Sequence, residues 1–297
     1  MWRLIPASRL RLGSAVSRDA RNRAGRRGFF VGQRIIAVCI CLWFPGNGLA
    51  AEREVDLELV LAVDISESID LAEATLQRQG FVYALRHPDV LDVIQRGRLG
   101  RVAITYIEWA GELYQNTLIG WTEIADAGSA AAFADAVEQI AVATAPWTSI
   151  SGAIAFAARS FEDNGFRGER RIIDISGDGP NNNGDPVVRV RDRALAVGIT
   201  INGLAIINDR PGAYGYPPFS DLDLYYRDCV IGGRGAFVVV ADGFNDFARA
   251  ILRKMVLEIA GAAPAARPSP VAADKPRPPC NAGEIQLQNW RAPIYDF

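Results

Sequence analysis

From residue 56 onward, apolar stretches of strand type alternate with stretches of helical periodicity, and this alternation limits the fold more than any other feature. The run LELVLAV, residues 57–63, is continuous and apolar, which is typical of a strand covered on both faces. The stretch that follows, residues 71–86, has helical spacing and ends before Pro88, which disfavours helix at the preceding residue. Such alternation predicts a mostly parallel sheet with helices on both faces.

The same pattern continues along the chain and predicts the remaining elements. Further strands are expected at residues 101–110, 112–121, 170–176, 200–207 and 236–241. Further helices are expected at residues 129–143, 149–163, 185–198 and 244–260. Ser129 is a candidate cap for the first of these helices, and Gly111 indicates an antiparallel hairpin at one edge of the sheet. The predicted fold is α/β and Rossmann-like: a doubly wound, mostly parallel six-stranded sheet with one antiparallel edge strand.

The first 51 residues indicate an export leader. Residues 1–50 hold nine arginines against one aspartate, and their apolar run at 35–44 is too short to span a bilayer. Small residues follow up to Ala51, as a signal peptidase requires, and RRGFFVGQ from Arg26 resembles a twin-arginine signal. We expect export to the periplasm or the outside by the Sec or twin-arginine route. Membrane attachment is expected only through an uncleaved leader.

The rest of the chain is acidic and keeps two cysteines. The leader's charge of +8 and the net charge of −2 leave −10 for residues beyond 50, so we expect no nucleic-acid partner. One domain is expected over residues 55–261, followed by a Pro/Ala-rich tail over residues 262–297. In an oxidising compartment Cys229 and Cys280 form either one disulfide or two free thiols, and the sequence favours neither.

Polar side chains stand where three of the predicted elements meet their loops. The candidate site residues are Asp64, Ser66, Ser68, Thr148 and Asp178. In open α/β sheets ligands bind outside the carboxyl ends of the strands, so these side chains are expected to converge there. Carboxylate and hydroxyl oxygens are hard donors that suit Mg²⁺, with Mn²⁺ or Ca²⁺ as alternatives. The competing interpretation is that Ser68 or Asp70 only caps the helix beginning near residue 71.

Other polar motifs offer weaker chemistry. The string PNNNGD, from Pro180, is typical of a turn, and it lacks the spaced acids of a calcium loop. Ser176 has no histidine near it in sequence, and His87, the only histidine, is expected to end a helix. We therefore expect no enzyme. The alternatives kept open are a metal-dependent hydrolase and a structural envelope protein without a working metal site.

The motif DISES, a threonine at the start of a helix and a strand ending in Asp-Gly together resemble the metal-ion-dependent adhesion site of von Willebrand factor type A domains. Asp64, Ser66 and Ser68 match its Asp-x-Ser-x-Ser element, Thr148 matches its threonine and Asp178 its second acid. Longer strings, such as RRIIDISGDGPNNNG and TSISGAIAFAARSF, resemble an exported bacterial family known as domain of unknown function 1194. This resemblance implies a type A-like fold, a bound divalent cation and an unidentified protein partner that presents a carboxylate.

The sequence also departs from that pattern. The second acid stands in Ser-Gly-Asp-Gly where Thr-Asp-Gly is usual, and Asp174, inside the predicted strand, is a competitor for its role. Trp147 is the aromatic residue best placed to line the site. A further aromatic group in the insertion at 208–235 serves either as an interaction surface or as cover for the core. Its members are Tyr214, Tyr216, Tyr225 and Tyr226.

Overall fold

The computed structural model describes residues 51–212, 215–262 and 276–291. The predicted leader up to residue 50 and Tyr214 lie outside the described residues, and the predicted domain limits remain predictions. None of the helices within these ranges has the length and apolar character needed to cross a membrane.

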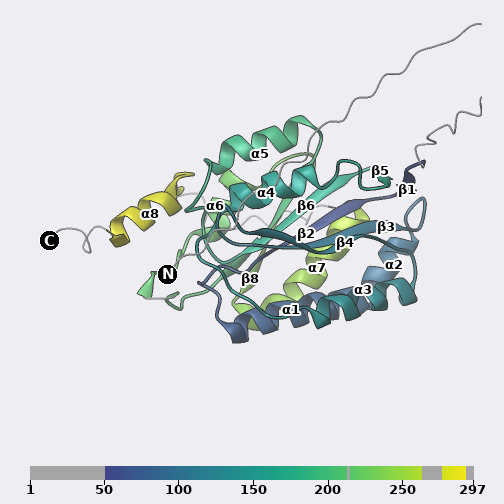
Figure 1. Cartoon of the computed structure of the whole chain (residues 1–297), viewed down its shortest axis with the longest axis horizontal. Helices are drawn as coiled ribbons and strands as arrows, with labels where there is room; N and C mark the ends of the chain where they lie inside the picture. Colours follow the sequence, from purple (N-terminus) through teal and green to yellow (C-terminus); the bar gives the residue numbers. More distant parts are fainter. Residues whose placement is uncertain (1–50, 213–214, 263–275, 292–297) are drawn as a thin grey trace, which may run out of the picture. The chain divides into compact units, whose positions relative to one another are not determined.

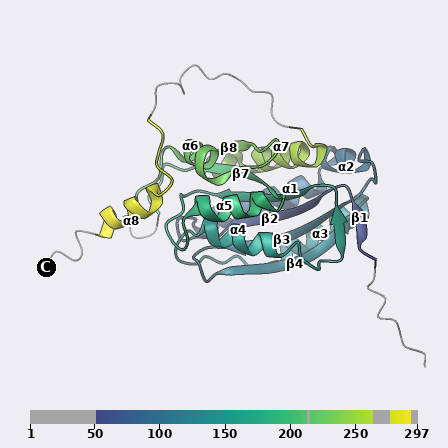
Figure 2. The ribbon, with the colours of Figure 1, turned by 90° about the horizontal axis from the view of Figure 1, so that it is seen from above.

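Among the described residues, six strands form the main sheet in the order β4-β3-β2-β6-β7-β8 (Figures 1 and 2). Their bounds are β2 Glu58–Asp64, β3 Val102–Trp109, β4 Gln115–Ile124, β6 Arg171–Gly177, β7 Thr200–Ile207 and β8 Val238–Asp242. Only the β3–β4 pair at the edge is antiparallel. The predicted fold class is therefore confirmed.

Helices cover both faces of this sheet, as the views of Figures 1 and 2 show. On one face lie α1 (Leu71–Arg86), α2 (Pro88–Gln95), α3 (Ala127–Gln139) and α7 (Phe247–Ala260). On the other lie α4 (Ile150–Arg159), α5 (Val187–Ala196) and α6 (Leu222–Tyr225), the last continued by a π-helical turn (Tyr226–Val230). Strand β2 lies between two apolar cores, because Leu59 and Leu61 pack into one while Val60 and Ala62 pack into the other. This explains its unbroken apolar run.

Local capping explains where the first helices begin. The Asp70 side chain accepts hydrogen bonds from the backbone N–H groups of Ala72 and Glu73, so Asp70 caps α1 and Ser68 does not. His87 ends α1 as expected, but a second helix then starts with Pro88 in its first turn, where the missing N–H costs nothing. In α3 the cap is Asp126, and Ser129 is its capping-box partner three residues later, which corrects the predicted role of Ser129.

Two short features were not predicted. Strands β1 (Arg53–Val55) and β5 (Phe166–Gly168) pair in parallel as a separate small sheet. Helix α8 (Ala282–Arg291) forms within the predicted tail. Strands β1 and β5 have three residues each, which is too few for a periodic pattern. Helix α8 follows a Pro-rich stretch, which hides it in the sequence.

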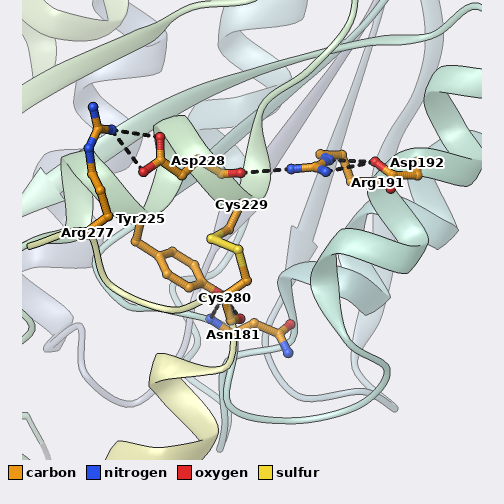
Figure 3. The surroundings of a disulfide bond; sticks show 8 residues. All are labelled: Asn181, Arg191, Asp192, Tyr225, Asp228, Cys229, Arg277 and Cys280. Carbon is orange, nitrogen blue, oxygen red and sulfur yellow. Dashed lines mark hydrogen bonds and ion pairs between the residues drawn. A yellow bond between two sulfur atoms is a disulfide. The ribbon is translucent and has the colours of Figure 1, made fainter.

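A disulfide joins Cys229 of the π-helical turn to Cys280, just before α8, so the bridge is the alternative that the structure contains (Figure 3). Next to it, the Arg277 guanidinium contacts both carboxylate oxygens of Asp228 at 2.8 and 2.9 Å. The Tyr225 hydroxyl donates to the carbonyl of Cys280 at 3.2 Å. These contacts hold the segment that leads into α8 against the α5–α6 face.

Candidate metal centre

The sheet brings the candidate residues together from three chain segments. Strands β2 and β6 are parallel neighbours with Val63 opposite Ser176, so the loops that follow them start side by side. Ser66 forms a parallel bridge with Ala145, which brings the loop before α4 to the same edge. Asp64, Ser66 and Ser68 therefore lie close to the loops of Thr148 and Asp178, at the edge of the sheet that the sequence predicted.

A chain of hydrogen bonds links four of the five candidates. The backbone N–H of Ser66 donates to Asp64 Oδ1 at 2.7 Å, and the hydroxyls of Ser66 and Ser68 lie 2.9 Å apart. The Ser68 hydroxyl then donates to Asp178 Oδ1 at 2.6 Å. Asp64 and Ser66 are buried, while Ser68 and Asp178 are half-buried. The fifth candidate, Thr148, is buried and lines the same cavity as Ser66, Ser68 and Asp178.

Asparagines from the PNNNGD string hold the loop of Thr148 against the loop of Asp178. The Thr148 N–H donates to Asn182 Oδ1 at 2.9 Å, and the Asn182 N–H donates to the Thr148 carbonyl at 2.8 Å. Asn181 Oδ1 accepts from the Ser151 N–H at 3.0 Å, at the start of α4. The sequence interpretation missed this role. The only signal in the sequence was the run of three asparagines. Their side-chain oxygens accept hydrogen bonds from backbone N–H groups.

Burial dominates the electrostatics of the two acids. Burial, and then the negative charge of Asp178, raise the pKa of Asp64 well above its usual range. Burial raises the pKa of Asp178 to about 6, against the opposing effect of the Ser68 hydrogen bond. Asp64 Oδ2 is buried without a hydrogen-bond partner. Among the described residues, no ion pair includes either acid, although Arg210, which pairs with Asp70 and Glu73, lines the same cavity as Asp178.

Gly177 and Tyr226 shape the space around Asp64. A Cβ on Gly177 would lie 2.7 Å from Asp64 Oδ2 and 2.8 Å from the Tyr226 hydroxyl, so no side chain fits there. Tyr226 is fully buried, and burial followed by the charge of Asp64 raises its pKa well above the usual value. Its phenol therefore stays protonated beside Asp64. Tyr225 is buried too, so these two rings of the insertion cover the core, while Tyr216 lines the cavity.

The competing acid, Asp174, belongs to a different cluster. Its carboxylate lies 2.5 Å from the Lys254 ammonium, which also lies 2.5 Å from Glu258 Oε1, and all three side chains are buried between β6 and α7. Burial first, and then the charge of Asp174, raise the pKa of Glu258 to about 8. Asp174 is thus paired inside the protein, away from the four linked candidates.

The donor set fits a hard divalent cation. Two carboxylates and two serine hydroxyls form one hydrogen-bonded cluster, Thr148 lines the cavity beside it, and one carboxylate oxygen has no partner. Within the described ranges no group of three or more His, Cys, Asp or Glu side chains is arranged to hold a metal. A cation here would therefore depend on serine and threonine oxygens, which suit Mg²⁺ rather than the softer metals.

A cavity of about 250 Å³ opens over these hydroxyls. Trp147 lines it as predicted, with φ of 70°, a left-handed backbone that is costly for a residue with a side chain. Pro217, Phe219 and Trp290 also line it. The lining therefore combines these apolar side chains with polar ones, which include Asp178, Asn208 and Arg210.

Several solved structures are similar to this chain. Proximal thread matrix protein 1 from the mussel byssus is 12% identical, with a TM-score of 0.51, over 70% of this chain and 49% of its own, so this chain spans about half of that protein. A von Willebrand factor type A protein from Catenulispora acidiphila is 16% identical, with a TM-score of 0.47, over 70% of this chain and 43% of its own. BatB from Bacteroides thetaiotaomicron is 21% identical, with a TM-score of 0.47, over 69% of this chain and all of its own.

At these identities the likeness concerns the fold. No curated protein matches the chain in sequence. A family model described as "Protein of unknown function (DUF1194)" matches residues 54–263, which include every element of the main sheet and all five candidate residues. The chain therefore belongs to the DUF1194 family and has a von Willebrand factor type A-like fold.

Proposed function

We propose that this chain is an exported binding module that uses a divalent cation to capture a carboxylate on a partner protein. The cation is Mg²⁺, with Mn²⁺ and Ca²⁺ as the other hard ions that such oxygens accept. Its ligands would be the side-chain oxygens of Asp64, Ser66, Ser68, Thr148 and Asp178. The two acids would act partly through water and the three hydroxyls directly.

One observation carries this proposal: a buried and a half-buried carboxylate are linked through the backbone N–H of Ser66 and the hydroxyls of Ser66 and Ser68, and Asp64 Oδ2 has no partner. Two acids held this close favour either a bound proton or a bound cation. When bound, the cation would supply positive charge for an incoming carboxylate. Around it, this chain's residues would position the ligand oxygens, and the Asn182 bonds would keep the Thr148 loop in place.

The sharpest test compares the two aspartates at the ends of the loop between β2 and α1. Asp64→Asn should abolish the rise in melting temperature that Mg²⁺ produces in the parent chain, because a ligand that binds only the folded state stabilises it. Asp70→Asn is the matched control: it removes a charge six residues away, and asparagine still caps α1. Its response to Mg²⁺ should equal that of the parent.

The alternatives predict other results. A metal-dependent hydrolase would turn over phosphoester substrates with Mg²⁺ and lose this turnover in Asp64→Asn. A structural protein without a working site would show no response to Mg²⁺, Mn²⁺ or Ca²⁺ in thermal melts or calorimetry. Either result would refute the proposed module.

A further inference from the structure

Helix α8 is anchored to the domain immediately beside the candidate metal centre. The Cys229–Cys280 disulfide and the Arg277–Asp228 ion pair fix the segment that precedes it (Figure 3). Within the helix, Glu284 Oε1 accepts a hydrogen bond of 2.9 Å from Asn181 Nδ2. Asn181 stands three residues after Asp178, so α8 rests on the loop that carries the second acid.

The first turn of α8 packs against the backbone of that loop. A Cβ placed on Gly283 would lie 2.1 Å from the Asn181 carbonyl oxygen and 2.7 Å from its carbon. Those are backbone atoms, which cannot rotate away as a flexible side chain would. Glycine is therefore needed at this position for α8 to dock, although it weakens the helix itself.

The far part of α8 forms one wall of the cavity over the candidate centre. Leu287 and Trp290 line it, and the Trp290 ring meets Tyr216 edge-on at 5.5 Å between centroids. The guanidinium of Arg291 lies 4.4 Å from the centre of the Trp147 ring, where it closes the rim. The cavity that is lined by the hydroxyls of the candidate centre thus also has an apolar wall outside the core of the domain.

Gln286 adds a polar atom to this wall. Its Nε2 donates to the Pro217 carbonyl at 2.8 Å, which fixes the orientation of the amide because a carbonyl only accepts. Its Oε1 is buried and has no hydrogen-bond partner. A buried acceptor without a partner is costly, and a backbone N–H of a ligand in the cavity would satisfy it.

The cavity's size limits what it can hold. At about 250 Å³ it is smaller than the roughly 300–1,000 Å³ of most small-molecule sites, so it fits one or two amino-acid side chains. Its polar part would take a carboxylate through the cation, and its apolar part would take a neighbouring apolar side chain. Both are present in a peptide segment with an acid next to a bulky apolar residue.

We propose that α8 is a structural part of the binding site, and that the partner segment presents an acidic side chain followed by a bulky apolar one. The acid pairs with the cation. The apolar side chain lies against Leu287 and Trp290, and a backbone N–H of the segment donates to Gln286 Oε1. This inference rests on the proposed cation-dependent function and names the chemical class of its partner.

Three capped tetrapeptides test it by calorimetry on the full chain with Mg²⁺: Gly-Asp-Phe-Gly, Gly-Asp-Gly-Gly and Gly-Asn-Phe-Gly. The first should bind about tenfold or more tightly than the second, because it also buries a phenyl ring. The third should not bind, because it lacks the acid. Equal affinity for the first two, or no binding of either, overturns the inference. If the Mg²⁺ response persists in that case, the proposed function itself survives.

Two variants test the role of α8. Gly283→Ala should displace the helix, and Trp290→Ala should remove part of the cavity wall while the contacts of the first turn of α8 remain. Both should lower the affinity for the Asp-Phe peptide to that of the Asp-Gly peptide, with the affinity for Mg²⁺ unchanged. Asn289→Ala, at an exposed position of the same helix, should bind like the parent. Unchanged peptide affinity in Trp290→Ala would overturn the role of α8.

One further variant tests whether the last residues of the chain itself occupy the cavity. Residues 292–297, APIYDF, themselves contain an acid between aromatic residues. A chain that stops after Arg291 should bind the Asp-Phe peptide with nearly the same affinity as the full chain. Any gain should be no more than about twofold, far less than the tenfold that corresponds to about 1.4 kcal/mol. If only the shortened chain binds the peptide, the cavity belongs to the chain's own end, and the inference of an external partner fails.

Discussion

The hydroxyl of Ser68 donates a 2.6 Å hydrogen bond to Oδ1 of Asp178, a residue 110 positions further along the chain. This contact connects the loop after β2 with the loop after β6. It also shows that Ser68 faces the sheet edge and not the start of α1, where Asp70 serves as the cap.

Removal of this hydroxyl should weaken cation binding. In Ser68→Ala we expect Mg²⁺ affinity, measured by calorimetry, to fall about tenfold or more, because a hydrogen bond to a carboxylate and a proposed ligand are lost together. Ser220→Ala, which changes an exposed serine, is the control and should bind as the parent does. Equal affinity in the two variants would argue against a ligand role for Ser68.

The Asn182 side chain should contribute to stability as well as to the site. Asn182→Ala leaves the buried N–H of Thr148 without its acceptor, and we expect a loss of about 1–3 kcal/mol in the free energy of unfolding, measured with urea. Mg²⁺ affinity should fall too, since the Thr148 loop is no longer held. The comparison is Asn289→Ala, at an exposed position of α8, and similar stability of the two variants would contradict the assigned role.

Gly177 should be intolerant of any side chain. In Gly177→Ala the new Cβ would crowd Asp64 Oδ2 and the Tyr226 hydroxyl, so we expect a loss of about 1–3 kcal/mol in stability together with loss of the Mg²⁺ response. Gly120→Ala is a matched control in β4, because nothing lies within 4 Å of its added Cβ. Thermal melts with and without Mg²⁺ measure both effects. A Gly177→Ala variant as stable as Gly120→Ala would show that the space beside Asp64 accommodates a methyl group.

Glu258 should make the protein less stable as the pH rises. Its pKa is about 8 in the folded chain against 4.5 for the ordinary group, so the folded state holds one more proton between those values. The free energy of unfolding should therefore fall by up to about 1.4 kcal/mol per pH unit over that window. Glu258→Gln keeps the amide contact with Asn202 and should flatten this slope in urea melts at pH 5, 6.5 and 8. An unchanged slope would indicate that Glu258 is ionised in the folded state.

The sequence predicted the strands and helices well wherever burial produces a periodic pattern of apolar residues. The apolar run of β2 and the helical spacing of α1 follow directly from one strand between two cores and one helix over a core. The candidate residues converge as expected because the carboxyl ends of parallel strands meet at one edge. This geometry depends on strand order alone.

Features set by single contacts between distant residues were not predictable. Asn182 reaches Thr148 across 34 positions, and Gly283 meets Asn181 across about a hundred, with no repeating pattern to indicate either. The helix after Pro88 was also missed, because proline marks both the end of one helix and the first turn of another. For Tyr226 the sequence left open an interaction surface or a cover for the core, and only the packing of the π-helical turn shows that the ring is buried.

The bond between Cys229 and Cys280 encloses β8 and α7 in a covalent ring. A protease that cuts the backbone between residues 263 and 275 would therefore not release the last segment. Such a nicked molecule would migrate as one band in a non-reducing gel and as two after treatment with dithiothreitol. Processing after α7 could thus change the ends of this protein without separating α8 from the domain it contacts.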